Sequence, residues 1–391
     1  MIERIINAKL KSLAAMYPVV TVTGPRQSGK TTLCQSTFPD KNYISLEPLD
    51  RREYATRDPR GLLAELGEGA VIDEIQHAPG LLSYLQDEVD ARPVPGRFII
   101  TGSQHFGLMA QVTQSLAGRT GVLFLLPPAL DELVLFPTAP GDLPGVIVSG
   151  AYPRIHDRGI PARQWLADYV TAYVERDVRQ VLNVVDLAAF TTFMRLCAGR
   201  TGQEMNLNAL GSDAGVTHNT ARSWLSVLEA GFIIARIPAW HRNVRKQAVR
   251  AAKIHFLDSG LACHLLGIEE PGQLAHHPLR GPIFESWVAA EVMKWRLNRG
   301  MQANLHHFRE VRGIEVDLMV EGRSIILCES KSGATVQSGF VAPLGKLAAS
   351  VGVAGEPRPV IRRLVYGGDD ARTQEGCEIV PWRQIANVSW E

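Results

Sequence analysis

The stretch GPRQSGKT at residues 24–31 decides the fold of this chain, because it matches the pattern G-x-x-x-x-G-K-[ST] of phosphate-binding loops. The apolar run PVVTVTG (18–24) leads into it, and a helix-forming run, TTLCQS, follows. The two glycines let the backbone turn so that amide groups face phosphate oxygens, and the N-terminus of the following helix adds a partial positive charge. We expect Lys30 to reach the β- and γ-phosphates and the Thr31 hydroxyl to hold Mg²⁺. The alternative is a glycine-rich turn that only joins a strand to a helix.

The residues around this loop alternate between strand-like and helix-like stretches. Further apolar, strand-like runs are NYISL (42–46), GAVID (69–73), RFIITGS (97–103) and GVLFLL (121–126). Between them lie stretches with helical periodicity, such as LLSYLQDEVDA at 81–91. This alternation is typical of βαβ units, so we expect a mainly parallel sheet whose ligand site lies at the C-terminal ends of the strands.

Polar residues at the ends of other strands complete the expected site. Asp73 and Glu74 follow a buried strand, and we expect Asp73 to bind Mg²⁺ through water and Glu74 to orient and deprotonate the attacking water. Thr101 and Ser103 follow the next strand, where Ser103 either senses the γ-phosphate or is only a hydrophilic strand end. Arg119 is either an arginine finger, in its own subunit or in a neighbour, or a surface arginine.

The predicted catalytic residues are therefore Lys30, Asp73, Glu74 and Arg119. The predicted nucleotide-binding residues are Gly24, Pro25, Arg26, Gln27, Ser28, Gly29, Lys30, Thr31, Thr32 and Ser103.

Length and composition indicate a soluble protein of several domains. The 391 residues predict two or three domains, and 46% hydrophobic residues supply sizeable cores. The net charge is +1 and the mean hydropathy is −0.01, so any surface for nucleic acid must be local. Apolar runs are shorter than the roughly 20 residues that a membrane span needs, and the opening residues are not typical of a signal peptide. Five widely spaced cysteines without a CxxC pair favour reduced thiols, so we expect a cytoplasmic protein that makes no membrane contact.

Residues 207–237 predict a helix, a turn at Gly215, a second helix and a strand, as in a winged helix. Thr217 is the expected N-cap of the second helix, on whose exposed start residues can meet base edges. Between residues 230 and 257 there are six basic residues and no acidic one, which suits phosphate contacts. The alternative is a structural lid on the nucleotide domain. The predicted nucleic-acid-binding residues are His218, Asn219, Arg222, Arg242, Arg245, Lys246 and Arg250.

Residues 313–333 predict a β-hairpin that turns near residues 321–322. Its first strand carries Asp317. Its second strand carries Glu329 and Lys331, whose side chains lie on the same face. This D…E-x-K pattern, with Glu285 on an upstream helix, resembles the PD-(D/E)xK restriction-endonuclease fold, in which carboxylates hold Mg²⁺ and the lysine activates water. Whether such a site cuts, or is a binding-only or structural remnant, is left open.

Motifs along nearly the whole chain resemble the bacterial and archaeal AAA-type ATPases that carry a C-terminal DUF4143 domain. The motifs are GPRQSGKTTL, YISLE at 43–47, DP at 58–59, AVIDEIQ, TGSQ, SLAGR, YVERDV at 173–178, KIHFLDSGL at 253–261 and GPIFESWVAAE at 281–291. The resemblance implies ATP as ligand and the ASCE type of P-loop fold, in which a glutamate follows the magnesium-binding aspartate.

Three domains are expected: a P-loop ATPase domain (1–160), a helical and winged-helix domain (161–265) and an α/β nuclease-like domain (266–391). One hypothesis is an ATPase with ATP and Mg²⁺ as cofactors, which couples nucleotide state to nucleic acid, DNA rather than RNA. The other hypothesis is a nucleotide-dependent switch or protein-binding module with slow turnover and a nuclease-like domain that does not cut. Self-assembly into a homo-oligomer is compatible with both.

Overall fold

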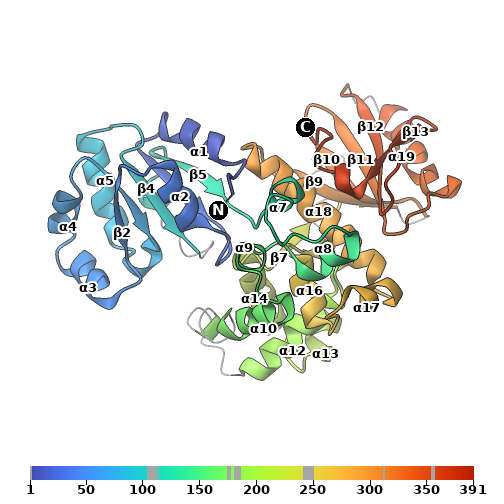
Figure 1. Ribbon diagram of the computed structural model, residues 1–391, viewed down its shortest axis with the longest axis horizontal. Coiled ribbons are helices and arrows are strands. Elements are labelled where there is room, and N and C mark those ends of the chain that lie inside the picture. Colours follow the sequence, from blue (N-terminus) through green and yellow to red (C-terminus); the bar gives the residue numbers. More distant parts are fainter. Residues whose placement is uncertain are drawn as a thin grey trace. The chain divides into compact units, whose positions relative to one another are not determined.

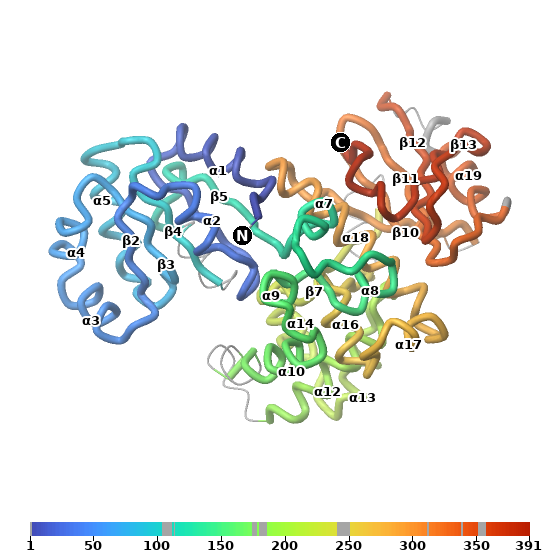
Figure 2. Tube along the Cα trace, viewed as in Figure 1, coloured from blue at the N-terminus to red at the C-terminus, as the bar shows by residue number. Residues whose placement is uncertain are grey.

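The computed structural model describes residues 2–103, 112, 114–173, 178–179, 186–240, 251–310, 313–353 and 357–391. Two compact units make up the chain: Met1–Pro128 with Ala230–Phe232 and Leu297–Met301, and Ala129–Glu229 with Ile233–Arg296 and Gln302–Glu391. The second unit joins residues from both of the later predicted domains. Figure 1 labels the elements, and Figure 2 follows the chain from β1 into α2 and onward.

The first unit is built on a five-stranded sheet in which every neighbouring pair of strands is parallel, in the order β2-β3-β4-β1-β5. The strands are β1 (Val19–Thr23), β2 (Asn42–Ser45), β3 (Ala70–Asp73), β4 (Phe98–Gly102) and β5 (Thr120–Phe124). All five predicted strands and the predicted parallel sheet are confirmed. Strand β4 lies between β1 and β3, so the sheet has the inserted strand of the ASCE type.

Helices cover both faces of this sheet, because alternate strand residues are apolar on each side. The helices are α1 (Asn7–Ala14), α2 (Lys30–Thr37), α3 (Leu49–Arg57), α4 (Pro59–Leu66) and α5 (Leu81–Ala91), with the 3₁₀ turn η1 (Ile75–His77). Helices α1 and α2 pack on one face, against side chains such as Val20, Val22 and Ile99. Helices α3, α4 and α5 pack on the other, against Ile72 and Ile100. The predicted helix at 81–91 is confirmed as α5.

The second unit begins with short helices and a helical core. Its helices are α7 (Leu130–Leu133), α8 (Leu143–Ser149), α9 (Pro153–Arg158), α10 (Ala162–Ala172), α12 (Leu187–Ala198), α13 (Leu207–Asp213), α14 (His218–Ala230), α16 (Ser259–Leu265), α17 (Pro271–His276) and α18 (Arg280–Asn298). A small antiparallel sheet, in the order β6-β8-β7, packs with them: β6 (Gln203–Glu204), β7 (Ile234–Ile237) and β8 (Lys253–Phe256). Phe190 and Phe193 meet Trp224 edge-on at the centre of this core.

The end of the chain forms a mixed six-stranded sheet in the order β13-β14-β12-β11-β10-β9. Its strands are β9 (Leu305–Arg309), β10 (Glu315–Glu321), β11 (Ile325–Lys331), β12 (Val360–Tyr366), β13 (Arg372–Gln374) and β14 (Cys377–Pro381). Also in this region are α19 (Ala342–Val353), η3 (Ser338–Phe340) and η4 (Trp382–Gln384), and α19 packs on the sheet. The predicted hairpin is confirmed as β10–β11.

Residues that follow β7 connect the small sheet to the large one. Trp240 N–H donates to His307 O at 2.6 Å, and His307 N–H donates to Pro238 O at 3.0 Å. The chain that leaves β7 therefore continues as a partner of β9. This pairing explains why residues of the second and third predicted domains form one compact unit.

Asp258 is a buried residue of the helical core whose carboxylate accepts hydrogen bonds from two separate segments. Its Oδ1 accepts the Leu261 N–H at 2.9 Å, as the N-cap of α16, and its Oδ2 accepts the Ala151 N–H at 2.8 Å. The side chain therefore ties the start of α16 to the end of α8. We expect Asp258→Ala to lower the free energy of unfolding by about 2–5 kcal/mol, because two buried N–H groups lose their acceptor.

Urea unfolding followed by tryptophan fluorescence measures this loss, since all seven tryptophans lie in the second unit. Asp369→Ala is the control, because Asp369 pairs with Arg383 at 3.4 Å while its side chain is 77% exposed. Exposed pairs contribute about 1 kcal/mol or less. Equal losses in the two variants would contradict the role of Asp258.

Candidate functional site

The loop between β1 and α2 has the shape of a phosphate cradle. Gly24 adopts φ +156°, and a Cβ there would lie 2.1 Å from Leu125 O, so only glycine fits against β5. Gly29 is left-handed at φ +96° and is the N-cap residue of α2. Gln27 also has a positive φ of 60°, and its side chain is exposed. Each of these positions turns the backbone around a space at the helix N-terminus, which is suited to an anion.

Two side chains of the loop, those of Lys30 and Ser28, have donor groups suited to phosphate oxygens. Lys30 is buried, and its Nζ donates to Gly24 O at 3.1 Å and to Pro25 O at 2.9 Å. Burial lowers the pKa of Lys30 to about 8. Ser28 Oγ is buried and has no hydrogen-bond partner among the described residues. A donor held only by loop carbonyls and an unpartnered hydroxyl fit a group rich in acceptor oxygens. Arg26 is half-buried in the same loop, and Thr32 is exposed on the first turn of α2.

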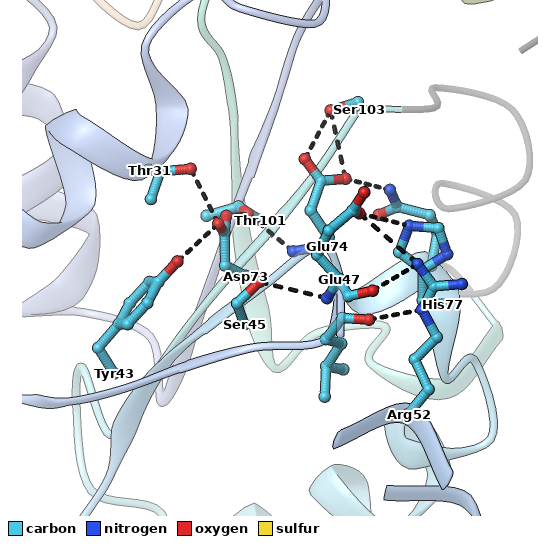
Figure 3. A network of polar contacts seen from close by, with 12 residues as sticks. Thr31, Tyr43, Ser45, Glu47, Arg52, Asp73, Glu74, His77, Thr101 and Ser103 are labelled. Atoms are coloured by element: carbon cyan, nitrogen blue, oxygen red, sulfur yellow. Dashed lines mark hydrogen bonds and ion pairs between the residues drawn. The ribbon is translucent and has the colours of Figure 1, made fainter. Parts of the chain in front are cut away.

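The Asp73 carboxylate accepts hydrogen bonds from hydroxyl groups of three different elements (Figure 3). Its Oδ2 accepts from Thr31 Oγ1 of α2 at 2.9 Å and from the Tyr43 hydroxyl of β2 at 3.0 Å. Its Oδ1 accepts from Thr101 Oγ1 of β4. The structure thus brings together Thr31 and Asp73, as a shared magnesium site requires.

Glu74 lies directly beyond the strand, in the left-handed conformation at φ 58°. Its N–H donates to Thr101 Oγ1 at 3.2 Å, which fixes its backbone against β4. Its carboxylate accepts from Ser103 Oγ at 3.0 Å and from the Gln76 amide (Figure 3). Ser103 and Glu74 are therefore neighbours at the C-terminal edge of the sheet.

Arg119 is the predicted residue that the structure does not bring to this edge. Thr120, the first residue of β5, pairs with Val19, the first residue of β1, whereas the loop leaves the other end of β1. Arg119 donates instead to Asp90 of α5, at 2.7 Å through its Nη2. The interpretation as an arginine finger acting in its own subunit is therefore wrong, because parallel pairing places the residue at the opposite edge. Action on a neighbouring subunit stays a prediction.

The nuclease-like residues gather around α18, β10 and β11. Lys331 Nζ lies 2.7 Å from Glu329 Oε2 and 4.0 Å from Asp317 Oδ2, and the Ser330 N–H donates to Asp317 Oδ2 at 2.9 Å. Burial, together with the neighbouring Asp317 carboxylate, raises the pKa of Glu329 to about 8.

A second lysine, Lys253 of β8, enters the same cluster. Its buried Nζ lies 2.9 Å from Glu285 Oε1 and 3.0 Å from Glu315 Oε1. Burial, together with the neighbouring Asp317 carboxylate, raises the pKa of Glu285 to about 8. Among the described residues, no group of three or more His, Cys, Asp or Glu side chains is arranged to hold a metal ion. The four predicted residues thus lie near one another, but lysines share the space between their carboxylates.

Helices α13 and α14 form the predicted helix pair. Thr217 Oγ1 accepts the Thr220 N–H at 3.2 Å, so the expected N-cap is present, and Gly215 is left-handed in the turn. At the start of α14, Asn219 and Arg222 are exposed and His218 is half-buried. Arg242, Arg245, Lys246 and Arg250 lie outside the described residues.

Three family models match the chain, one after another. An AAA domain matches residues 16–134, a domain of unknown function (DUF8612) matches 141–272, and another domain of unknown function (DUF4143) matches 280–385. The chain belongs to the AAA-type ATPases with a C-terminal DUF4143 domain. The resemblance drawn from the motifs is confirmed.

Relatives of this AAA-type chain include uncharacterized proteins of Mycobacterium tuberculosis and Mycobacterium bovis. Each is 29% identical over 332 residues, which is 80% of this chain and 70% of the relative. Among solved structures, a Walker-type ATPase of Pyrococcus abyssi covers 66% of this chain and 94% of its own, at 15% identity and a TM-score of 0.43. A RuvB variant of Thermotoga maritima covers 60% and 89%, at 20% identity and a TM-score of 0.32. In the part of the AAA-type chain that the structure describes, no helix is long and apolar enough to cross a membrane.

Arg4 is a residue of the AAA-type site that sequence reasoning missed. This buried side chain donates to Ser28 O in the loop at 3.1 Å and to Leu126 O beyond β5 at 2.9 Å. It lies just before α1, so no motif marks it. The only available signal is that Arg4, next to Glu3, interrupts the apolar residues of the run IERII (2–6).

Further contacts beside Glu74 were not predicted from the motifs. His77 Nε2 lies 3.1 Å from Glu47 Oε2, and Arg52 donates to Glu47 O at 2.7 Å (Figure 3). Burial lowers the pKa of His77. These contacts fix the connection between β2 and α3 next to the site.

We expect Arg4→Met to weaken binding of a fluorescent ATP analogue roughly three- to thirtyfold, because the loop loses the two charge-assisted hydrogen bonds through which Arg4 joins Ser28 O to Leu126 O. Arg4→Lys keeps the charge but lacks the fork that spans both carbonyls, so it should also weaken binding. Arg60→Met is the control, since Arg60 is exposed and lies over the Tyr84 ring of the same unit. Full affinity in Arg4→Met would show that the loop binds nucleotide without the Arg4 hydrogen bonds. Full affinity in Arg4→Lys would show that the positive charge alone accounts for the effect.

Proposed function

We propose that the chain binds ATP with Mg²⁺ at the loop of residues 24–31 and hydrolyses it. The observation that carries this proposal is the 2.9 Å hydrogen bond from Thr31 to Asp73, with Glu74 next in the chain. It unites the magnesium-binding hydroxyl, the carboxylate and a candidate base at one edge of the sheet. The same function is supported by the predicted loop residues, by the buried Lys30 and by the Ser28 hydroxyl, which has no hydrogen-bond partner among the described residues.

Hydrolysis requires a water oxygen to bond to the γ-phosphorus while the bond from that phosphorus to the β–γ bridging oxygen breaks. Glu74 accepts the proton of the attacking water, and ADP leaves with the electron pair of the broken bond. To do so, Glu74 exchanges its Ser103 and Gln76 donors for that water. Lys30 exchanges the two loop carbonyls for phosphate oxygens and neutralises their charge.

Thr31 and Asp73 are the residues that would hold Mg²⁺, Thr31 directly and Asp73 through water. The ion would supply charge neutralisation at the phosphates. Gly24 and Gly29 give the backbone the close approach that the phosphates need.

The first test separates binding from turnover. Lys30→Ala should abolish both, because the phosphates lose their buried cation. Glu74→Gln should keep ATP binding but lower kcat by about 10²- to 10⁴-fold, because the amide cannot accept the water's proton. Phosphate release and fluorescent-nucleotide binding measure the two effects. Glu53→Gln, at an exposed position on α3 of the same unit, is the matched control. Turnover that survives in Glu74→Gln would contradict the assigned base.

We further propose that the helix pair α13–α14 contacts DNA and that nucleotide state alters this contact. The capped N-terminus of α14 exposes Asn219 and Arg222, and the antiparallel strands β7 and β8 follow as in a winged helix. The basic residues between these strands, including Arg242 and Lys246, suit phosphate contacts.

Arg222→Ala tests this contact. If the arginine meets a phosphate, binding should weaken for all DNA sequences and the slope of log affinity against log salt should fall by about one. Fluorescence anisotropy of labelled double- and single-stranded DNA measures both. Arg195→Ala, an exposed arginine on α12, is the control. No salt-sensitive binding by the unaltered protein would leave α13–α14 as a structural lid.

The second candidate function is a nucleotide-dependent switch whose nuclease-like domain does not cut. The buried ammonium of Lys253 favours this function, because it pairs with Glu285 and Glu315 and offsets negative charge that a metal ion would otherwise offset. In this case ATP turnover would be slow and indifferent to DNA, which the ATPase assay above reveals when it is repeated with DNA present.

A further inference from the structure

Tyr43 contacts the magnesium-binding carboxylate, although no motif assigns it a role. It lies on β2, the edge strand next to β3, where Ser45 pairs with Asp73. Its hydroxyl donates to Asp73 Oδ2 at 3.0 Å, the same oxygen that accepts from Thr31 at 2.9 Å. A residue of the sheet edge thus shares one oxygen with the nucleotide loop (Figure 3).

The Asp73 carboxylate has few acceptor positions to spare. An ionised carboxylate offers about four lone-pair positions, two on each oxygen. Thr31 and Tyr43 take both positions on Oδ2, and Thr101 takes one on Oδ1. Magnesium in proteins usually keeps several of its waters, and a carboxylate that binds the ion through water must accept from one of them. One position on Oδ1 stays open, but Oδ2 is the oxygen bonded to Thr31, so a water of an ion held by Thr31 meets the Tyr43 hydroxyl there.

Tyr43 is the donor that can leave most easily. Thr101 is fully buried within β4, and Thr31 is fixed in the first turn of α2. The Tyr43 side chain, in contrast, is 41% exposed, and it lines a cavity of about 370 Å³ along the outer edge of β2, together with Pro48 and Arg51. The ring therefore has room to turn away without opening the core. A tyrosine hydroxyl ordinarily keeps its proton at neutral pH, so Tyr43 remains a donor to Asp73.

We propose that Tyr43 is a positioning residue that holds Asp73 while magnesium is absent and competes with the ion's water for Oδ2. Binding of Mg²⁺ with nucleotide releases the Tyr43 hydroxyl, so a side chain on the outer edge of the sheet responds to nucleotide state. This inference rests on the proposed function, because it requires ATP at residues 24–31 and Mg²⁺ at Thr31 and Asp73.

Tyr43→Phe tests the competition, because it removes the hydroxyl and keeps the ring. The nucleotide is a fluorescent, non-hydrolysable ATP analogue, and Mg²⁺ is titrated from EDTA upward. The variant should reach half-saturation at roughly three- to tenfold lower Mg²⁺ concentration, since one hydrogen bond to a charged group no longer has to be broken. Its affinity for the analogue in EDTA should stay within about twofold of the unaltered protein. Tyr84→Phe is the matched control, a half-buried tyrosine on α5 that packs with Arg60, and its Mg²⁺ midpoint should not move.

A spectroscopic measurement follows the hydroxyl itself. With 3-fluorotyrosine at all eight tyrosines, the Tyr43 ¹⁹F resonance is the one missing from Tyr43→Phe. It should shift when Mg²⁺ is added to the nucleotide complex and stay in place when nucleotide is added in EDTA.

An unchanged or higher Mg²⁺ midpoint in Tyr43→Phe would overturn the competition and make Tyr43 a support of the metal site. A Tyr43 ¹⁹F resonance that does not shift when Mg²⁺ is added would also overturn it. If the unaltered protein binds no nucleotide, the proposed function fails and this inference fails with it. Because the EDTA arm measures nucleotide binding alone, the two failures are distinguishable.

Discussion

The carboxylate of Asp73 is the contact on which the nucleotide site depends. Parallel pairing puts the ends of β1, β3 and β4 at one edge, so a single side chain at the end of β3 can meet the start of α2 and the strands on either side. Hydroxyls from Thr31, Tyr43 and Thr101 converge there. Because each donor comes from a different element, the carboxylate fixes the relative positions of the loop, the inserted strand and the sheet edge.

In the second unit, buried charged side chains take a comparable structural role. Asp258 joins α8 to α16, while Glu291 of α18 accepts the Leu130 N–H at 2.7 Å and pairs with Lys294 at 2.8 Å. Each carboxylate binds backbone N–H groups or a cation, which offsets the cost of its burial. The motifs KIHFLDSGL and GPIFESWVAAE contain Asp258 and Glu291, so part of the family resemblance reflects how this unit is held together.

The sequence was sufficient for the five strands of the parallel sheet, the β10–β11 hairpin and the loop, because strand alternation and glycine spacing are local properties. It also placed Thr31, Asp73 and Glu74 together, since the ends of parallel strands meet at one edge. It could not locate Arg4, which lies in none of the motifs, or the role of Tyr43, which opens the motif YISLE without any sign of its contact with Asp73. Both contacts cross 24 or more residues. Nor could it foresee that Lys253, one charge in a basic stretch, lies buried between two carboxylates. Such pairings depend on tertiary packing, which short-range patterns do not encode.

The most direct test of the account is a crystal structure of the chain with Mg²⁺ and a non-hydrolysable ATP analogue. The account predicts the triphosphate on the loop of residues 24–31, Lys30 turned from the Gly24 and Pro25 carbonyls to phosphate oxygens, and the ion between Thr31 and Asp73. Nucleotide bound elsewhere would contradict it. So would a loop that keeps Lys30 on its own carbonyls at saturating nucleotide.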